Sequence, residues 1–132
     1  MTESLELSTF FSGVIAENLY NAWLDSGEHT AMTGSPAQVE PRADGRFTAW
    51  DGYIYGKTLE LQPFWLIVQA WRTTEFPVEA PDSHLEVWLE ERDGGVQLRL
   101  VHTEIPDGQG QDYRQGWEEF YFKPMGEYFS GE

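Results

Sequence analysis

Three Asp-Gly dipeptides in the middle of the chain constrain its fold more than any other feature of the sequence. Asp44-Gly45, Asp51-Gly52 and Asp93-Gly94 are residue pairs that readily adopt positive φ in tight β-hairpins. The segments around them alternate apolar and polar residues, which is typical of half-buried strands. These signals predict an antiparallel arrangement of six strands near residues 37–42, 46–50, 53–61, 66–75, 84–92 and 96–105.

The turn positions also predict which side chains face one another across the hairpins. A two-residue turn at Asp51-Gly52 places Phe47 opposite Gly56, and a loop over residues 62–65 then places Gly56 opposite Trp71. A β-bulge in strand 53–61 would change the second of these pairs. The turn at Asp93-Gly94 predicts a firmer apolar face, made of the pairs Leu89–Leu98, Val87–Leu100 and Leu85–His102.

Helical patterns stand on both sides of this strand region. A period-two segment over residues 4–10 predicts a first strand, and Ser12 stands where the N-cap of a following helix belongs. Asp25 and Glu28 form a capping pair for a second short helix, which we expect to end near Gly34. These patterns predict two short helices between the first strand and the rest of the sheet.

The last block of the chain, from Asp112 to Phe129, predicts a long helix that is apolar over most of its circumference and therefore largely covered. Pro124 lacks an amide N–H and clashes with the carbonyl group of Phe120, so we expect a kink there. We interpret this kink as a bend that follows a curved sheet, in preference to a hinge over a cavity mouth.

The charge of the chain limits the partners that it can bind. Its 132 residues carry 23 Asp and Glu against 8 Lys and Arg, for a formal net charge of −15. An acidic surface repels phosphate backbones and anionic membranes, and no two basic residues stand side by side to form a basic patch. We therefore expect neither nucleic acid nor membrane as a partner, and basic or neutral partners instead.

Catalytic and metal-binding motifs are missing from the sequence. The chain has no cysteine, its three histidines lack metal-ligand spacing, and no nucleophile, phosphate-loop or dinucleotide motif occurs. The first residues do not resemble a signal peptide, and no apolar run is long enough for a transmembrane helix. We expect one domain over residues 1–132, without catalytic residues, metal or cofactor, in the cytoplasm.

Several motifs, in order, resemble one known family. These motifs are Ala43–Phe47, Asp51–Gly56, Leu59–Pro63, Ile67–Arg72, Val101–Pro106 and Arg114–Phe122. The chain resembles the C-terminal domain of the activator of heat-shock-protein-90 ATPase, within the START and birch-pollen-allergen-like superfamily. The resemblance implies an α+β helix-grip (START-like) fold, in which a curved antiparallel β-sheet wraps around a long C-terminal helix and two short helices follow the first strand. It also implies a hydrophobic cavity between sheet and helix.

We expect from this resemblance a non-enzymatic binding module, co-chaperone-like, with a heat-shock-protein-90-type chaperone as a possible partner. The alternative is a carrier or sensor of a small hydrophobic ligand, and a weaker third interpretation is an enzyme that uses His102 and Glu104. The residues expected to line the ligand cavity are Phe47, Trp71, Val87, Leu89, Leu98, Leu100, His102, Trp117, Phe120 and Tyr121. For His102, a hydrogen-bonded position at the end of a core strand competes with a ligand contact. The expected partner surface is Arg114, Gln115 and Gly116.

Overall fold

A single antiparallel sheet organises the molecule, which is described here by a computed structural model over residues 2–130. Its strand order is β1-β7-β6-β5-β4-β3-β2, so the first strand pairs with the last. The strands are β1 (Thr2–Ser12), β2 (Gln38–Val39), β3 (Arg46–Ala49), β4 (Ile54–Gln62), β5 (Leu66–Thr73), β6 (Ser83–Arg92) and β7 (Gly95–Pro106). The predicted strands are thus all present, and β2 is shorter than expected.

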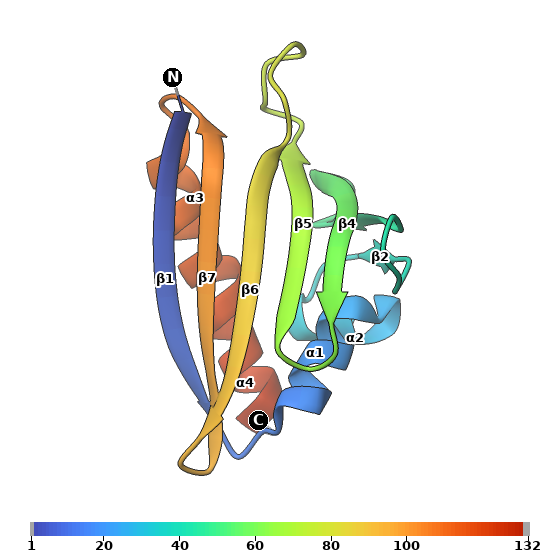
Figure 1. Cartoon of the computed structure of the whole chain (residues 1–132), viewed down its shortest axis with the longest axis vertical. Helices are drawn as coiled ribbons and strands as arrows, with labels where there is room; N and C mark the ends of the chain where they lie inside the picture. Colours follow the sequence, from blue (N-terminus) through green and yellow to red (C-terminus); the bar gives the residue numbers. More distant parts are fainter. Residues whose placement is uncertain (1, 131–132) are drawn as a thin grey trace.

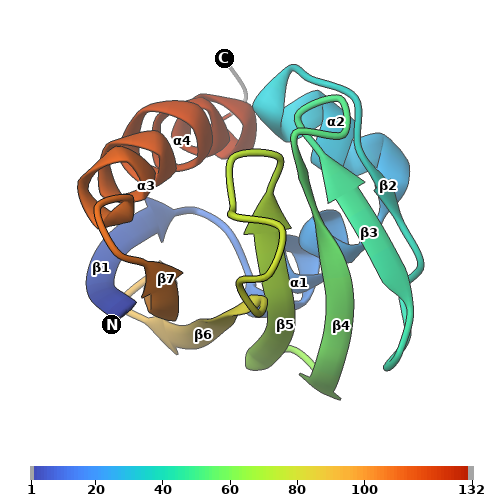
Figure 2. The ribbon, with the colours of Figure 1, turned by 90° about the horizontal axis from the view of Figure 1, so that it is seen from above.

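All helices lie on one side of this sheet (Figure 1). Two short helices, α1 (Ala16–Leu24) and α2 (Ser26–Thr33), follow β1, and a long C-terminal helix ends the chain. The C-terminal helix consists of α3 (Gly110–Gly116), a π-helical segment η1 (Trp117–Phe122) and α4 (Lys123–Ser130). Figure 2 shows this helix lying across the concave side of the curved sheet, as the family resemblance implies.

The predicted residue pairs across the hairpins are confirmed. Phe47 pairs with Gly56, and Gly56 pairs with Trp71. In the β4–β5 hairpin, however, the pairing next to the turn is shifted by one residue from the prediction, because Gln62 pairs with Leu66. A β-bulge between Thr58 and Glu60 compensates for this shift, so the predicted pair of Gly56 and Trp71 still forms. The apolar pairs across the β6–β7 turn are confirmed as well: Leu89–Leu98, Val87–Leu100 and Leu85–His102.

The expected N-cap of the first helix was wrong. Ser12 still belongs to β1, where it pairs with Gly95, and α1 begins only at Ala16. Because no local side chain caps α1, the amide of Ala16 donates instead to the Glu91 carboxylate of β6, at 3.0 Å. A helix end leaves several amides without intrahelical partners, and here a strand distant in sequence supplies the acceptor.

The predicted cap of the second helix is confirmed. The carboxylate of Asp25 accepts a hydrogen bond from the amide of Glu28 at 2.8 Å. At the other end Gly34 has a φ of 83°, and its amide donates to the carbonyl oxygen of Thr30. Glycine adopts this left-handed conformation without a steric penalty, so the helix ends where the sequence predicts.

The C-terminal helix accommodates Pro124 by widening one of its turns. The amide of Lys123 donates to the carbonyl oxygen of Glu118, five residues earlier, which is the π-helical spacing. Pro124 follows directly and has no amide to donate. The irregularity expected at Pro124 therefore takes the form of a π-helical segment, and this segment contains Trp117, Phe120 and Tyr121.

Candidate functional site

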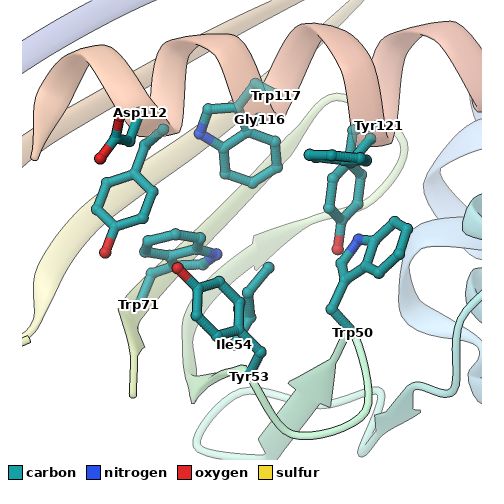
Figure 3. Close-up of a pocket in the computed structure, with 10 residues that line it drawn as sticks. Trp50, Tyr53, Ile54, Trp71, Asp112, Gly116, Trp117 and Tyr121 are labelled. Atoms are coloured by element: carbon teal, nitrogen blue, oxygen red, sulfur yellow. The ribbon is translucent and has the colours of Figure 1, made fainter. Parts of the chain in front are cut away.

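A pocket of about 290 Å³ lies between the C-terminal helix and the end of the sheet formed by β3, β4 and β5. Seven of the ten residues that line it are aromatic. Figure 3 shows them converging from the helix on one side and from the β3–β4 turn and β5 on the other. The lining residues are Trp50, Tyr53, Ile54, Trp71, Asp112, Tyr113, Gly116, Trp117, Phe120 and Tyr121.

Helical spacing places two rows of the C-terminal helix against this pocket. Asp112, Gly116 and Phe120 form one row at intervals of four residues, and Tyr113, Trp117 and Tyr121 form the next. Gly116 has no side chain, so it leaves space between its neighbours. The second row is buried, whereas Phe120 is 51% exposed and stands where the pocket meets solvent.

A chain of hydrogen bonds around His102 holds two of the pocket tryptophans. The Ser83 hydroxyl lies 2.6 Å from the Trp71 carbonyl oxygen, to which it donates, so the same hydroxyl accepts from His102 Nε2 at 2.8 Å. His102 Nδ1 then accepts from Trp117 Nε1 at 3.1 Å. This arrangement requires the neutral Nε2–H tautomer, and burial, assisted by the charge of His84, lowers the pKa of His102 to about 3.

A second buried histidine supports Tyr121 in the same manner. His29 Nδ1 lies 2.8 Å from the carbonyl oxygen of Trp23, so this nitrogen carries the proton and donates. His29 Nε2 therefore accepts from the Tyr121 hydroxyl, also at 2.8 Å. Burial lowers the pKa of His29 and raises the pKa of Tyr121, so both groups are neutral at pH 7.

Trp50 contrasts with these satisfied neighbours. Among residues 2–130, its Nε1 is the one buried side-chain nitrogen or oxygen without a hydrogen-bond partner. Trp50, Asp51 and Gly52 also have consecutive positive φ values of 52°, 57° and 88°, a conformation that is unusual for a bulky residue such as tryptophan. Strain and unpaired polar groups concentrate at binding sites more than elsewhere. Among the residues that line the pocket, Trp50 has both a strained backbone and an unpaired polar atom.

The structure places four of the ten predicted cavity residues in the pocket wall: Trp71, Trp117, Phe120 and Tyr121. The other six are buried in the core and do not line this pocket. They are Phe47, Val87, Leu89, Leu98, Leu100 and His102. Five of the six lie on β6 and β7, whose inner faces pack against other core residues. The sixth, Phe47, packs beside Gly56.

The predicted partner surface divides in a similar way. Gln115 is exposed and Arg114 half-buried, whereas Gly116 lines the pocket. For His102, the hydrogen-bonded core position agrees with the geometry described above. His102 is fully buried and hydrogen-bonded to Ser83, whereas the side chain of Glu104 is exposed. The structure therefore does not bring them together as an acid–base pair.

Five pocket residues were not in the predicted set: Trp50, Tyr53, Ile54, Asp112 and Tyr113. The sequence held a signal for two of them, because Tyr113 precedes Trp117, and Asp112 precedes Gly116, by one helical turn. No local signal identifies the other three. They belong to the β3–β4 hairpin, and their distance from the helix depends on the curvature of the sheet.

Residues 2–130 contain no group of three or more His, Asp or Glu side chains that could hold a metal ion. None of the helices within this range is long and apolar enough to cross a membrane.

Solved structures show which known fold the chain shares. It superposes on a Plasmodium falciparum protein, described as an HSP90 activator, with a TM-score of 0.88 and 24% identity over 96% of both chains. CalU16 from Micromonospora echinospora superposes with a TM-score of 0.81 and 20% identity, over 98% of this chain and 77% of that one. Likenesses at this identity establish the fold alone. With the curved sheet and the long helix, they confirm the α+β helix-grip (START-like) fold.

The sequence comparisons identify the family. The human Activator of 90 kDa heat shock protein ATPase homolog 1 is 28% identical over 113 residues, which are 86% of this chain and 33% of the human protein. The chain thus spans about a third of the length of this relative. The family model described as "Activator of Hsp90 ATPase homolog 1-like protein" matches residues 14–130. Because this match covers most of the chain, the protein belongs to the Activator of Hsp90 ATPase homolog 1-like family.

Proposed function

We propose that this chain is a non-catalytic, co-chaperone-like module, acting as one unit over residues 1–132, that contacts an Hsp90-type chaperone. The observation that supports this most directly is the family match over residues 14–130. The relatives' printed names describe activators of Hsp90 ATPase, and the chain spans about a third of the human one. For residues 1–132 by themselves, we expect weak contact with little or no stimulation of the chaperone. A cytoplasmic location is part of the same proposal.

The net charge of −15 predicts how this contact depends on salt. Exposed charge pairs are screened over about 8–10 Å at physiological ionic strength, so binding weakens sharply between low and physiological salt. The experiment is a titration of isotope-labelled protein with the Hsp90-type chaperone of the same organism, in which amide shifts and ATP turnover are followed together. Shifts confined to one face that fade with added salt support the proposal.

A pair of arginine variants locates the contact. Arg114 belongs to the expected partner surface, and Arg42 is an exposed arginine on the loop between β2 and β3. We expect Arg114→Ala to reduce the amide shifts and Arg42→Ala to leave them unchanged. Unchanged spectra and unchanged turnover for the parent protein at high chaperone concentration would remove the co-chaperone proposal.

The pocket supports a second candidate function, which is the binding of a small, mainly apolar ligand. Its volume of about 290 Å³ and its largely aromatic wall are typical of small-molecule sites. Such sites also contain a few polar groups that orient the ligand, and the wall of this pocket includes the polar side chains of Tyr53, Asp112 and Tyr113. Native mass spectrometry of freshly purified protein tests this function, because a bound ligand adds mass that denaturation removes.

A further inference from the structure

The pocket wall combines aromatic rings with a single charge. None of its ten residues is Lys, Arg or His, and Asp112 is the one carboxylate among them. Three of the rings are indoles, from Trp50, Trp71 and Trp117. Aromatic faces carry a negative quadrupole that attracts cations, most strongly in tryptophan. The wall therefore favours a positively charged group and offers no basic partner to a carboxylate or phosphate.

A second carboxylate adds to the negative charge at the same end of the pocket. The hydroxyl of Tyr53, which lines the pocket, donates a hydrogen bond to Glu75. Burial raises the pKa of Tyr113, and the charges of Glu75 and Asp112 raise it further. Both carboxylates thus act on the Tyr113 hydroxyl, which lies 2.7 Å from Thr73 Oγ1.

The two arginines that directly follow pocket residues in the sequence, Arg72 and Arg114, do not neutralise this charge. Arg72 follows the pocket residue Trp71 on β5, so it points to the opposite face of the sheet. There its guanidinium donates to Asp82 and to the carbonyl oxygens of Ala80 and Pro77, at 2.9–3.1 Å. Arg114 is two residues from Asp112, and residues at this spacing do not face each other on a helix.

We propose that the pocket binds an organic cation, in which an ammonium or quaternary ammonium group is attached to an apolar body. The cationic group lies towards Asp112 and the apolar body against the indoles. Figure 3 shows Asp112 and Trp50 at opposite ends of the pocket, with Trp71 and Tyr53 between them. This inference deepens the second candidate function and rests on it, since it names the chemical class of the ligand.

The test uses three probes of similar shape that differ in charge. Phenyltrimethylammonium is the cation, tert-butylbenzene is its neutral carbon isostere, and 4-tert-butylbenzoate is an anion. Binding is followed at low salt through the indole N–H resonances of the six tryptophans. We expect the cation to bind about tenfold more tightly than the neutral isostere, and the anion more weakly than either.

A matched pair of variants assigns the charge preference to Asp112. Asp112→Asn removes the carboxylate of the pocket, and Glu118→Gln removes a carboxylate of the same helix that is exposed like Asp112 but does not line the pocket. We expect Asp112→Asn to weaken cation binding by about three- to tenfold at low salt without affecting the neutral isostere. Glu118→Gln should change cation binding much less. A urea melt of each variant checks that it is folded.

The outcomes separate this inference from the function on which it rests. If the neutral isostere binds as tightly as the cation, the pocket holds apolar ligands and the cation proposal is overturned. Equal effects of the two variants overturn it too, because Asp112 then serves only the first turn of α3, where an acidic residue stabilises the helix. If none of the probes perturbs the indole resonances of the pocket, both the cation proposal and the ligand-binding function fail.

Discussion

His102 illustrates how single residues position the pocket without lining it. Its ring bridges Trp117 and Ser83, and Ser83 in turn donates to the backbone of Trp71. Two opposite walls of the pocket are thereby connected through one neutral imidazole. A protonated ring would place a hydrogen on Nδ1, where it would meet the Trp117 N–H, so protonation breaks the chain of hydrogen bonds.

The low pKa of His102 predicts that acid destabilises the fold. The folded protein does not protonate this ring until about pH 3, whereas the unfolded chain does so near 6.5. The contribution of this pKa difference to the free energy of unfolding is complete above about pH 6.5. It is lost as the pH falls towards 3, because protons bind preferentially to the unfolded state. Between pH 7 and 5 this amounts to about 2 kcal/mol of unfolding free energy.

Urea melts of the parent protein and of His102→Gln at pH 7 and 5 check this expectation. The carboxylates and His29 are common to both proteins, so their contributions to the pH dependence cancel in the comparison. The parent should lose about 2 kcal/mol more than the variant. Equal losses would show that protonation of His102 does not control the acid stability.

Among the elements, β4 is adapted to its neighbours at Gly56. This residue lies between Phe47 on β3 and Trp71 on β5. A Cβ placed on Gly56 would lie 1.9 Å from the Ala70 carbonyl oxygen and 3.1 Å from the Phe47 ring. The backbone of Ala70 cannot move without disturbing the sheet, so the strands can approach this closely only with glycine.

The contrast between two glycines tests this close approach. Gly56→Ala should destabilise the protein by about 2–4 kcal/mol, as expected for overpacking against backbone. Gly126→Ala in α4 meets no atom within 4 Å and should be neutral or stabilising by up to about 1 kcal/mol, because alanine favours the helix. Urea midpoints measure both, and a tolerated Gly56→Ala would contradict the pairing distances of β4.

The C-terminal helix depends on its buried row in the same way. Trp117 is 3% exposed, stacks with Trp23 and packs against Trp71 at a tilted angle. Trp117→Ala should therefore cost about 3–5 kcal/mol. Phe120→Ala removes a half-exposed ring of the same helix and should cost about 1 kcal/mol. If urea melts show that Trp117→Ala lowers the free energy of unfolding by less than about 1 kcal/mol, this face of the helix is not packed against the core.

At the scale of the whole molecule, the charge of −15 acts against the compact state. The five ion pairs between Lys or Arg and carboxylates among the described residues join side chains that are mostly exposed, and such pairs contribute little. The ion pairs therefore balance only part of the repulsion between the excess negative charges. Dissolved salt screens this repulsion.

We therefore expect salt to stabilise the protein. Raising NaCl from about 20 to 200 mM should increase the melting temperature by about 2–4 °C, since screening reduces the repulsion. Calorimetry or circular dichroism measures the shift, and an uncharged solute at equal osmolality is the control. A melting temperature that is unchanged or lower in salt would indicate that the exposed ion pairs outweigh the repulsion.

The sequence by itself determined the strands, the register of the β3–β4 and β6–β7 hairpins, and the inner faces of β6 and β7. Side-chain alternation and turn residues act between neighbours along the chain, so Val87, Leu89, Leu98 and Leu100 could be assigned to one face from spacing alone. The same holds for the Asp25 cap, which spans three residues. Four pocket residues were also found in this way, because the helical stripe and the register of β5 pointed to them.

Only the tertiary structure decided which inward-facing residues line the pocket. Spacing assigns a residue to a face, but whether that face meets the helix or stands apart from it depends on the curvature of the whole sheet. For this reason Phe47 and Leu100 lie in the core, while Trp50 and Tyr53 border the pocket. The hydrogen bond to Glu91 that caps α1 also depends on the tertiary structure, since Glu91 and Ala16 are 75 positions apart. The same holds for the partners of His102, which are 19 and 15 positions away in the sequence. These side-chain contacts result from the packing of all elements together, and no local pattern contains them.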